Sequence, residues 1–219
     1  MAQELTYNPD VFRVPDEDAA KRIILTPERG MDTDERWSRE TPYLGELLAK
    51  HLPVPPGGLI VDFGCGIGRL AREMIVRLQR PVLGVDISQD MRRLAPPYVD
   101  SEGFSIASAE LFKRMVLSGL RVDAALSVWV IEHCLRPADD LDLLALALKP
   151  GGRLAIVNGK GRAVPTKERP WVSDGVDVRK LLAERFDVVE EGALDPAVIG
   201  GEEMSQATFW GVYAKRPSA

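Results

Sequence analysis

Short apolar runs alternate with segments of helical periodicity along most of the chain. The runs are uninterrupted rather than alternating with polar residues, as expected of strands that are buried on both faces. Strands that alternate with amphipathic helices indicate a parallel sheet covered by helices on both faces, so the pattern predicts an α/β fold. The predicted strands are residues 59–63, 81–85, 104–107, 122–130, 154–157, 186–189 and 207–214.

Prolines and N-capping residues suggest where several of the helices begin and end. A helical pattern starts near Asp32, and Thr41 followed by Pro42 has the sequence of an N-cap with proline at the first helical position. Ser88 is expected to cap a later, short helix that ends at the Pro96-Pro97 pair. Further helices are predicted at residues 17–24, 70–78, 109–117, 137–148 and 178–185.

Residues 1–31 are predicted to form an irregular N-terminal arm or lid, and residues 32–219 a single domain. Residues 159–175 form a second irregular segment, which is basic and aromatic. Neither segment shows an apolar period that would tie it to the core. We therefore expect the arm to lie over the site without being needed for folding.

Composition narrows the class of protein. The chain has 219 residues, 45% of them apolar, and a net charge of −5, which is ordinary for a globular protein and argues against a broad nucleic-acid-binding surface. There is no apolar run long enough to span a membrane, and the N-terminus lacks the pattern of a signal peptide, so a soluble, cytoplasmic protein is expected. Cys65, Cys134, His51 and His133 are too few and too scattered for a disulfide framework or a zinc site, and no metal is predicted.

A glycine-rich turn between a predicted strand and a predicted helix is the strongest chemical signal. It reads Val61-Asp62-Phe63-Gly64-Cys65-Gly66-Ile67-Gly68-Arg69, and Asp86 ends the following strand. An acid in that position can accept hydrogen bonds from both hydroxyls of a ribose. Arg69 stands where a dinucleotide-binding turn has its third glycine, and the carboxylate of Asp62 suits an ammonium or sulfonium group better than a diphosphate. The turn therefore favours S-adenosylmethionine over a nicotinamide cofactor.

Four motifs together give the chain a family resemblance. They are VDFGCGIGR (61–69), GVDIS (84–88), VDAALSVWVIEH (122–133) and LKPGGRLAIVNG (148–159). In this order and spacing they resemble a small class I S-adenosylmethionine-dependent methyltransferase. The resemblance implies a seven-stranded, mostly parallel, doubly wound sheet of order 3-2-1-4-5-7-6 with the last strand antiparallel.

The resemblance also implies which residues hold S-adenosyl-L-methionine, whose product is S-adenosyl-L-homocysteine. Gly64, Cys65 and Gly66 would contact the methionine portion with Asp62 nearby, and Asp86 would bind the ribose. The remaining implied cofactor-binding residues are Ile87 against the adenine, Ser108 and Ala109 after the third strand, Ser127 and Val128 on the opposite wall, and Trp37 and Arg39 near the cofactor carboxylate. Ser108 replaces the acid that the family usually has, so either Ser108 or Glu110 would bind the adenine amino group, or Ser108 only caps a helix.

The chemistry implied is in-line transfer of a methyl group to an O, N or C nucleophile, driven mainly by proximity. His133, at the mouth of the site, is a candidate general base, although it could instead satisfy backbone groups at a strand end. A small-molecule acceptor is expected, and a nucleic-acid or protein acceptor stays open because residues 159–175 are basic and aromatic. Two alternatives are a nicotinamide-dependent oxidoreductase and a non-catalytic binding partner that keeps the methyltransferase fold.

Overall fold

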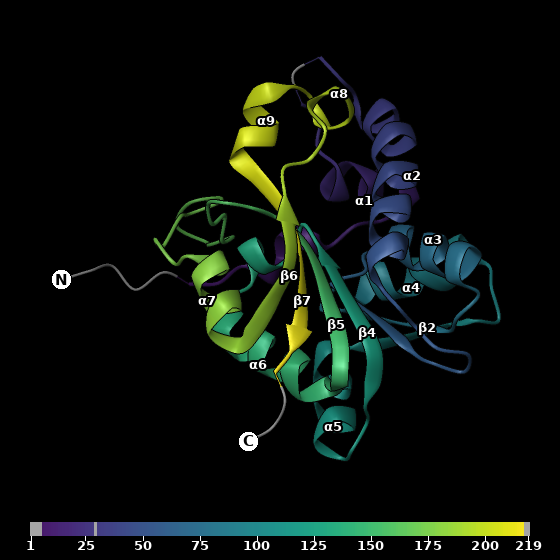
Figure 1. The fold of residues 1–219 in the computed structure, drawn as a ribbon. Coiled ribbons are helices and arrows are strands. Elements are labelled where there is room, and N and C mark those ends of the chain that lie inside the picture. The colour runs from purple at the N-terminus through teal and green to yellow at the C-terminus, as the bar shows by residue number, and fades with distance from the viewer. Residues whose placement is uncertain (1–5, 29, 217–219) are drawn as a thin grey trace.

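The strands of the computed structural model, which describes residues 6–28 and 30–216, form a seven-stranded sheet of order β3-β2-β1-β4-β5-β7-β6 (Figure 1). Strands β1 to β5 pair in parallel, and β7 is antiparallel to both β5 and β6. The predicted strand order and the antiparallel last strand are confirmed. The strands are β1 (Ile60–Phe63), β2 (Val82–Asp86), β3 (Phe104–Ser108), β4 (Val122–Val128), β5 (Leu148–Gly159), β6 (Phe186–Gly192) and β7 (Thr208–Lys215).

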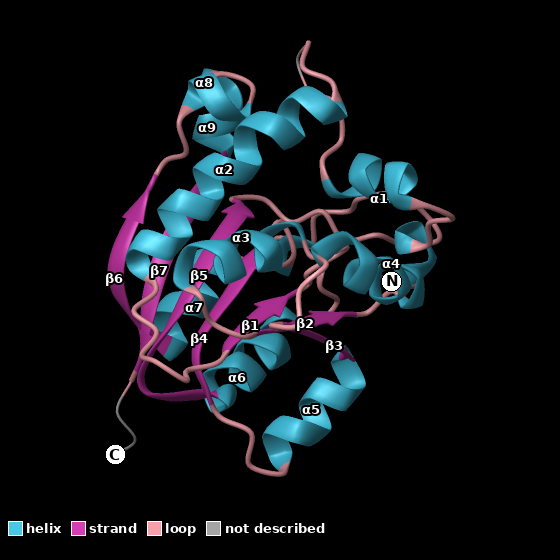
Figure 2. Cartoon of the chain, turned by 90° about the vertical axis from the view of Figure 1, so that its right-hand side faces the viewer, coloured by secondary structure: helices cyan, strands magenta, loops and turns pink. Residues whose placement is uncertain are grey.

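Helices cover both faces of this sheet, as Figure 2 shows. Leucines of α2 and α3 pack with one face, whereas α5, α6 and α7 pack with the other. The helices are η1 (Pro9–Phe12), α1 (Glu17–Ile24), α2 (Thr33–His51), α3 (Arg69–Leu78), α4 (Gln89–Val99), α5 (Ala109–Leu117), η2 (Ile131–His133), α6 (Pro137–Ala147), α7 (Val178–Arg185), α8 (Pro196–Ile199) and α9 (Glu202–Ala207). Within the described ranges, no helix has both the length and the apolar character needed to cross a bilayer.

Two helix boundaries predicted from proline are wrong. Helix α2 is capped by Asp32 and runs through Thr41 and Pro42, and α4 runs through the Pro96-Pro97 pair to Val99. Proline removes one helical hydrogen bond, but packing of the buried faces of these helices outweighs that local cost. The predicted capping role of Ser88 is confirmed, because its side chain accepts a hydrogen bond from the backbone N–H of Met91.

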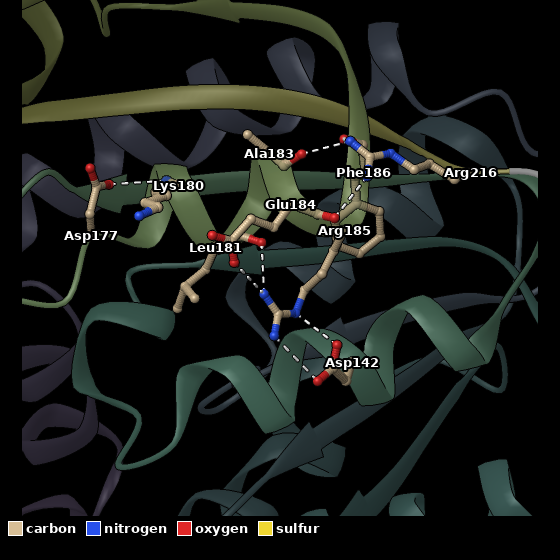
Figure 3. A network of polar contacts seen from close by, with 9 residues as sticks. All are labelled: Asp142, Asp177, Lys180, Leu181, Ala183, Glu184, Arg185, Phe186 and Arg216. Carbon is tan, nitrogen blue, oxygen red and sulfur yellow. Dashed lines mark hydrogen bonds and ion pairs between the residues drawn. The ribbon is translucent and has the colours of Figure 1, made fainter.

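The far end of α7 is tied to the rest of the domain by two arginines (Figure 3). Arg185 forms a bidentate ion pair with Asp142 of α6, with N–O distances of 2.7 and 3.3 Å. Arg216, just after β7, donates hydrogen bonds to the backbone carbonyls of Ala183 and Phe186. These contacts satisfy carbonyls that a helix C-terminus leaves unpaired, and so hold α7 against the sheet.

The N-terminal arm is packed against the body of the domain. The predicted helix at residues 17–24 is confirmed as α1, and its fully buried Ala20 forms a separate apolar cluster with Val14, Ile67 and Met91. Helix α1 therefore lies beside α4 (Figure 2). The expectation that the arm lacks apolar contacts with the body is wrong, because a single helical face with a few apolar residues is enough to dock so short a segment.

Candidate functional site

A cavity of about 470 Å³ opens at the carboxyl ends of the central strands. Strand β1 is followed by β2 on one side, whereas β4 lies on its other side, so the cavity sits where the winding of the sheet reverses. Open parallel sheets bind ligands at this position. The strand-end residues that line it include Gly64, Val85, Asp86, Ile87, Val128 and Val130.

The glycine-rich turn that follows β1 is shaped by contacts within the protein. Gly64 has a φ of +78°, and a Cβ atom there would collide with the side chain of Val130. At Gly66, with a φ of +55°, a Cβ would approach Ile24 of the arm to 2.7 Å. Left-handed backbone and close packing both require glycine here. Of the residues in and before the turn that were predicted to bind the cofactor, Gly64 lines the cavity, whereas Asp62, Cys65 and Gly66 are outside its lining.

The Asp86 carboxylate lies at the end of β2, on the cavity wall. Its Oδ1 accepts a hydrogen bond of 2.8 Å from the N–H of Ser88, and its Oδ2 accepts one of 2.8 Å from the N–H of Gly66. Burial raises the pKa of Asp86, and these two N–H groups act in the opposite direction. Each oxygen keeps lone-pair capacity for a ligand hydroxyl. Beside it, the apolar side chain of Ile87 is 51% exposed and offers a surface for a flat ring.

Buried charges lie on the α2 and α3 side, behind the glycine-rich turn. Asp62 is buried, and its Oδ2 has no hydrogen-bond partner among the described residues. Burial raises the pKa of Asp62 to about 7, and the Arg69 guanidinium acts in the opposite direction. Glu40 pairs with Arg36 through Oε1, and its Oε2 is also without a partner in the described chain. Unpaired buried oxygens are costly, and a ligand ammonium would satisfy them.

Several residues predicted to bind the cofactor lie away from the cavity. Trp37 packs against Tyr98, and the Arg69 guanidinium lies 5.4 Å from the centroid of the Trp37 ring. Arg39 is exposed and forms an ion pair with Glu35. Ser108 caps α5 by accepting a hydrogen bond from Leu111, which is the alternative role that its sequence allowed.

Of the residues predicted after β3 and on the opposite wall, some line the cavity and others do not. Ala109 and Val128 line the cavity, and their contact with the cofactor stays a prediction. Ser127 is buried in β4, and its hydroxyl has no hydrogen-bond partner among the described residues. The structure thus brings together Gly64, Asp86, Ile87, Ala109, Val128 and His133.

His133 lines the cavity, and one of its two ring nitrogens is hydrogen-bonded to the backbone. Its Nδ1 lies 2.7 Å from the carbonyl oxygen of Ala163, which can only accept, so Nδ1 carries the proton and Nε2 is the basic nitrogen. Burial lowers the pKa of His133, so the neutral form is favoured. The Nε2 atom is 3.6 Å from Oε1 of Glu132. Burial raises the pKa of Glu132 to about 7, although the N–H of Gly159 donates a hydrogen bond of 2.5 Å to its carboxylate, which acts in the opposite direction.

The sequence predicted an arm over the site, but it did not predict which arm residues line the cavity, nor the residues of the far wall. The arm contributes Tyr7, Phe12, Ile23 and Ile24, and the far wall is made by Lys113, Leu135, Arg136, Asp139, Asp140 and Leu143. Phe12 is placed by a hydrogen bond of 2.8 Å from the Ser88 hydroxyl to its carbonyl oxygen. No periodicity marks such contacts, because they join segments far apart in the chain.

The basic segment 159–175 does not present its arginine and lysine side chains to the cavity. Arg162 is buried in an ion pair with Asp174, and Lys160 donates to a backbone carbonyl. Among the described residues of this segment, Trp171 lines the cavity. In the described chain, no group of three or more His, Cys, Asp or Glu side chains is arranged to hold a metal ion.

Comparison with known proteins agrees with this geometry. Residues 32–173 match the family described as methyltransferase domain, and the chain belongs to that family. It is 32% identical over 117 residues to the methyltransferase GfsG of Streptomyces halstedii, covering 52% of this chain and 42% of that protein. It is also 32% identical over 130 residues to a ubiquinone biosynthesis O-methyltransferase of Bartonella bacilliformis, covering 57% and 47% respectively. The aligned part of the chain thus spans less than half of each relative.

The fold has a solved counterpart in a geranyl diphosphate methyltransferase in complex with GPP and sinefungin. The TM-score is 0.59 at 20% identity, covering 80% of this chain and 78% of that one. The predicted membership of the class I S-adenosylmethionine-dependent methyltransferases is therefore confirmed, and S-adenosylmethionine is the cofactor of this family.

The buried Asp62 makes stability depend on pH. Its folded pKa of about 7 lies above its ordinary value of 3.8, so the folded state holds the extra proton between these values. Stability therefore falls as pH rises through that window, and stays low above it. We expect Asp62→Asn to raise the unfolding free energy by about 1–3 kcal/mol at about pH 8, and by less at about pH 5. Urea denaturation at both pH values checks this, and an equal effect at both would contradict a buried, ionising carboxylate.

Proposed function

We propose that this protein transfers the methyl group of S-adenosylmethionine to an O, N or C nucleophile of a small molecule bound in the cavity. The observation that carries the proposal is the Asp86 carboxylate, held by two backbone N–H groups at the strand-end cavity with Ile87 exposed beside it. A ribose with its base attached needs that combination of a paired hydroxyl acceptor and an apolar ledge.

The buried charges behind the glycine-rich turn lie outside the cavity lining, and their chemistry suits the amino-acid end of the cofactor. Among the described residues, Asp62 and Glu40 each keep one unpaired carboxylate oxygen that an ammonium group could satisfy, and Arg36 and Arg69 supply positive charge for a carboxylate. Bound there, the cofactor supplies an electrophilic methyl group on a sulfonium, and a neutral thioether leaves as the methyl–acceptor bond forms. A nicotinamide cofactor fits less well, because an unpaired buried acid opposes a diphosphate.

On the acceptor side, the protein's own groups position the nucleophile and take its proton. His133 presents Nε2 as a base near the cavity, with Glu132 placed to stabilise the resulting imidazolium. The arm, with Phe12 and Ile24 in the cavity wall, acts as a lid that excludes water and holds the acceptor in line. A cytoplasmic location stays a prediction.

Cofactor binding should depend on Asp86. We expect Asp86→Asn to weaken binding of S-adenosylhomocysteine by about 1–3 kcal/mol, because the ribose hydroxyls lose a charged acceptor. Titration calorimetry measures this, with Asp100→Asn as a control, since Asp100 ends α4 in left-handed backbone that asparagine tolerates. Unchanged affinity in Asp86→Asn would remove Asp86 from the site.

Methyl transfer should depend on neutral His133. Incubation of the protein with methyl-labelled S-adenosylmethionine and a metabolite extract should label an acceptor, and the rate should fall as pH drops through a pKa below the ordinary value of 6.5. His133→Gln should slow the reaction by about 10²-fold or more and flatten that limb of the profile. A variant with the wild-type rate and profile would show that His133 is no base, and a complete lack of transfer would favour a non-catalytic binding protein.

A further inference from the structure

Two tryptophans in the cavity wall have a backbone conformation that tryptophan rarely adopts. Among the described residues, the non-glycine residues with positive φ are Gln79, Asp100, Trp129 and Trp171. Gln79 and Asp100 end helices, where left-handed backbone is common. Trp129, with φ +59°, and Trp171, with φ +55°, end no helix, and both line the same cavity.

Core packing does not account for the strain at Trp171. Left-handed backbone costs a bulky residue about 1–2 kcal/mol, and it persists only where the surroundings enforce it. Trp171 is 43% exposed, so its burial recovers only part of the cost. Val164 and Val172 exchange backbone hydrogen bonds of 2.9 and 2.8 Å next to it, which fixes the loop and aims the indole at the cavity. Strain of this kind is typical of ligand-binding positions.

Three rings from distant segments meet at this point. The ring centroid of Trp171 lies 5.1 Å from that of His133 and 6.4 Å from that of Phe12, and the Phe12 and His133 centroids are 6.3 Å apart. The planes are inclined to one another by 55–62°, so the rings meet at an angle instead of stacking in parallel. All three rings also line the cavity, and aromatic surface in a cavity wall is suited to contact with a flat, conjugated ligand.

Charge in the far wall of the cavity is balanced. Asp139 and Asp140 are matched by Lys113 and Arg136, and the neutral form of His133 is favoured. A polyanion such as RNA would need an excess of positive charge here. The wall therefore favours an acceptor that carries no strong charge.

We propose that Phe12, His133 and Trp171 form an aromatic corner that binds the acceptor, and that the acceptor is a planar phenol. The inference rests on the proposed methyl transfer and names its substrate class. The phenolic O–H would face Nε2 of His133, which takes the proton as the O–CH₃ bond forms and the S–CH₃ bond breaks, leaving a methyl aryl ether, an imidazolium and a neutral thioether.

The test uses β-naphthol as a probe for the corner and decahydro-β-naphthol as its saturated, non-planar counterpart. Both are titrated by calorimetry into the full-length protein saturated with S-adenosylhomocysteine. We expect β-naphthol to bind at least about tenfold more tightly than the saturated alcohol, and Trp171→Gly to weaken its binding by about tenfold. Trp171→Phe should keep most of the affinity, and Trp210→Phe is the matched control, because Trp210 lies on β7 outside the cavity lining.

A second readout separates ligand binding from folding. Because glycine accepts left-handed backbone, Trp171→Gly should have an unchanged or higher Tm while it loses affinity for β-naphthol. Normal β-naphthol binding by Trp171→Gly, equal binding of the two alcohols, or no binding of β-naphthol would each overturn the inference. Displacement of β-naphthol by oligo-uridylate would overturn it in favour of a nucleic-acid acceptor. Failure of S-adenosylhomocysteine itself to bind would instead contradict the proposed function.

Discussion

The carboxylate of Asp86 accepts a backbone hydrogen bond on each oxygen, and much of the site depends on that arrangement. One bond comes from Gly66 in the turn after β1, and the other from Ser88 at the start of α4. The Ser88 hydroxyl in turn donates to the carbonyl of Phe12 in the arm. A single buried acid thus joins two strand ends and, through one serine, the roof of the cavity. Such charge-assisted hydrogen bonds are strong where solvent is excluded.

The energetic cost of the site is concentrated in a few residues. Asp62 and Glu40 each keep a buried oxygen without a partner in the part of the chain that the structure describes, and Trp129 and Trp171 hold strained backbone at the cavity wall. A domain that optimised stability alone would avoid all four features. Two of these features line the cavity and two lie behind the glycine-rich turn beside it, as a ligand site would produce, because a bound molecule can satisfy polar groups and offset strain that the protein alone carries.

Features that depend on interactions between residues close in sequence could be predicted, and features that depend on contacts between distant segments could not. Buried strands and α1 were predicted well, because apolar runs and capping residues act locally. Thr41 was assigned wrongly as a helix start, since packing of α2 against the sheet overrides the local effect of Pro42. Asp86 could be singled out from the sequence because it ends the strand that follows the glycine-rich turn. The place of Phe12 in the cavity, in contrast, depends on contacts with segments far along the chain. The backbone strain of Trp171 leaves no mark in the sequence, so its importance emerges only from three-dimensional structure.

The most direct test of this account is the crystal structure of the protein with S-adenosylhomocysteine. Both ribose hydroxyls should lie within hydrogen-bonding distance of the Asp86 carboxylate, the adenine against Ile87, and the ammonium group directed toward Asp62. Phe12 and Trp171 should keep their places in the cavity wall. A ligand bound elsewhere, or one whose ribose does not contact Asp86, would contradict it.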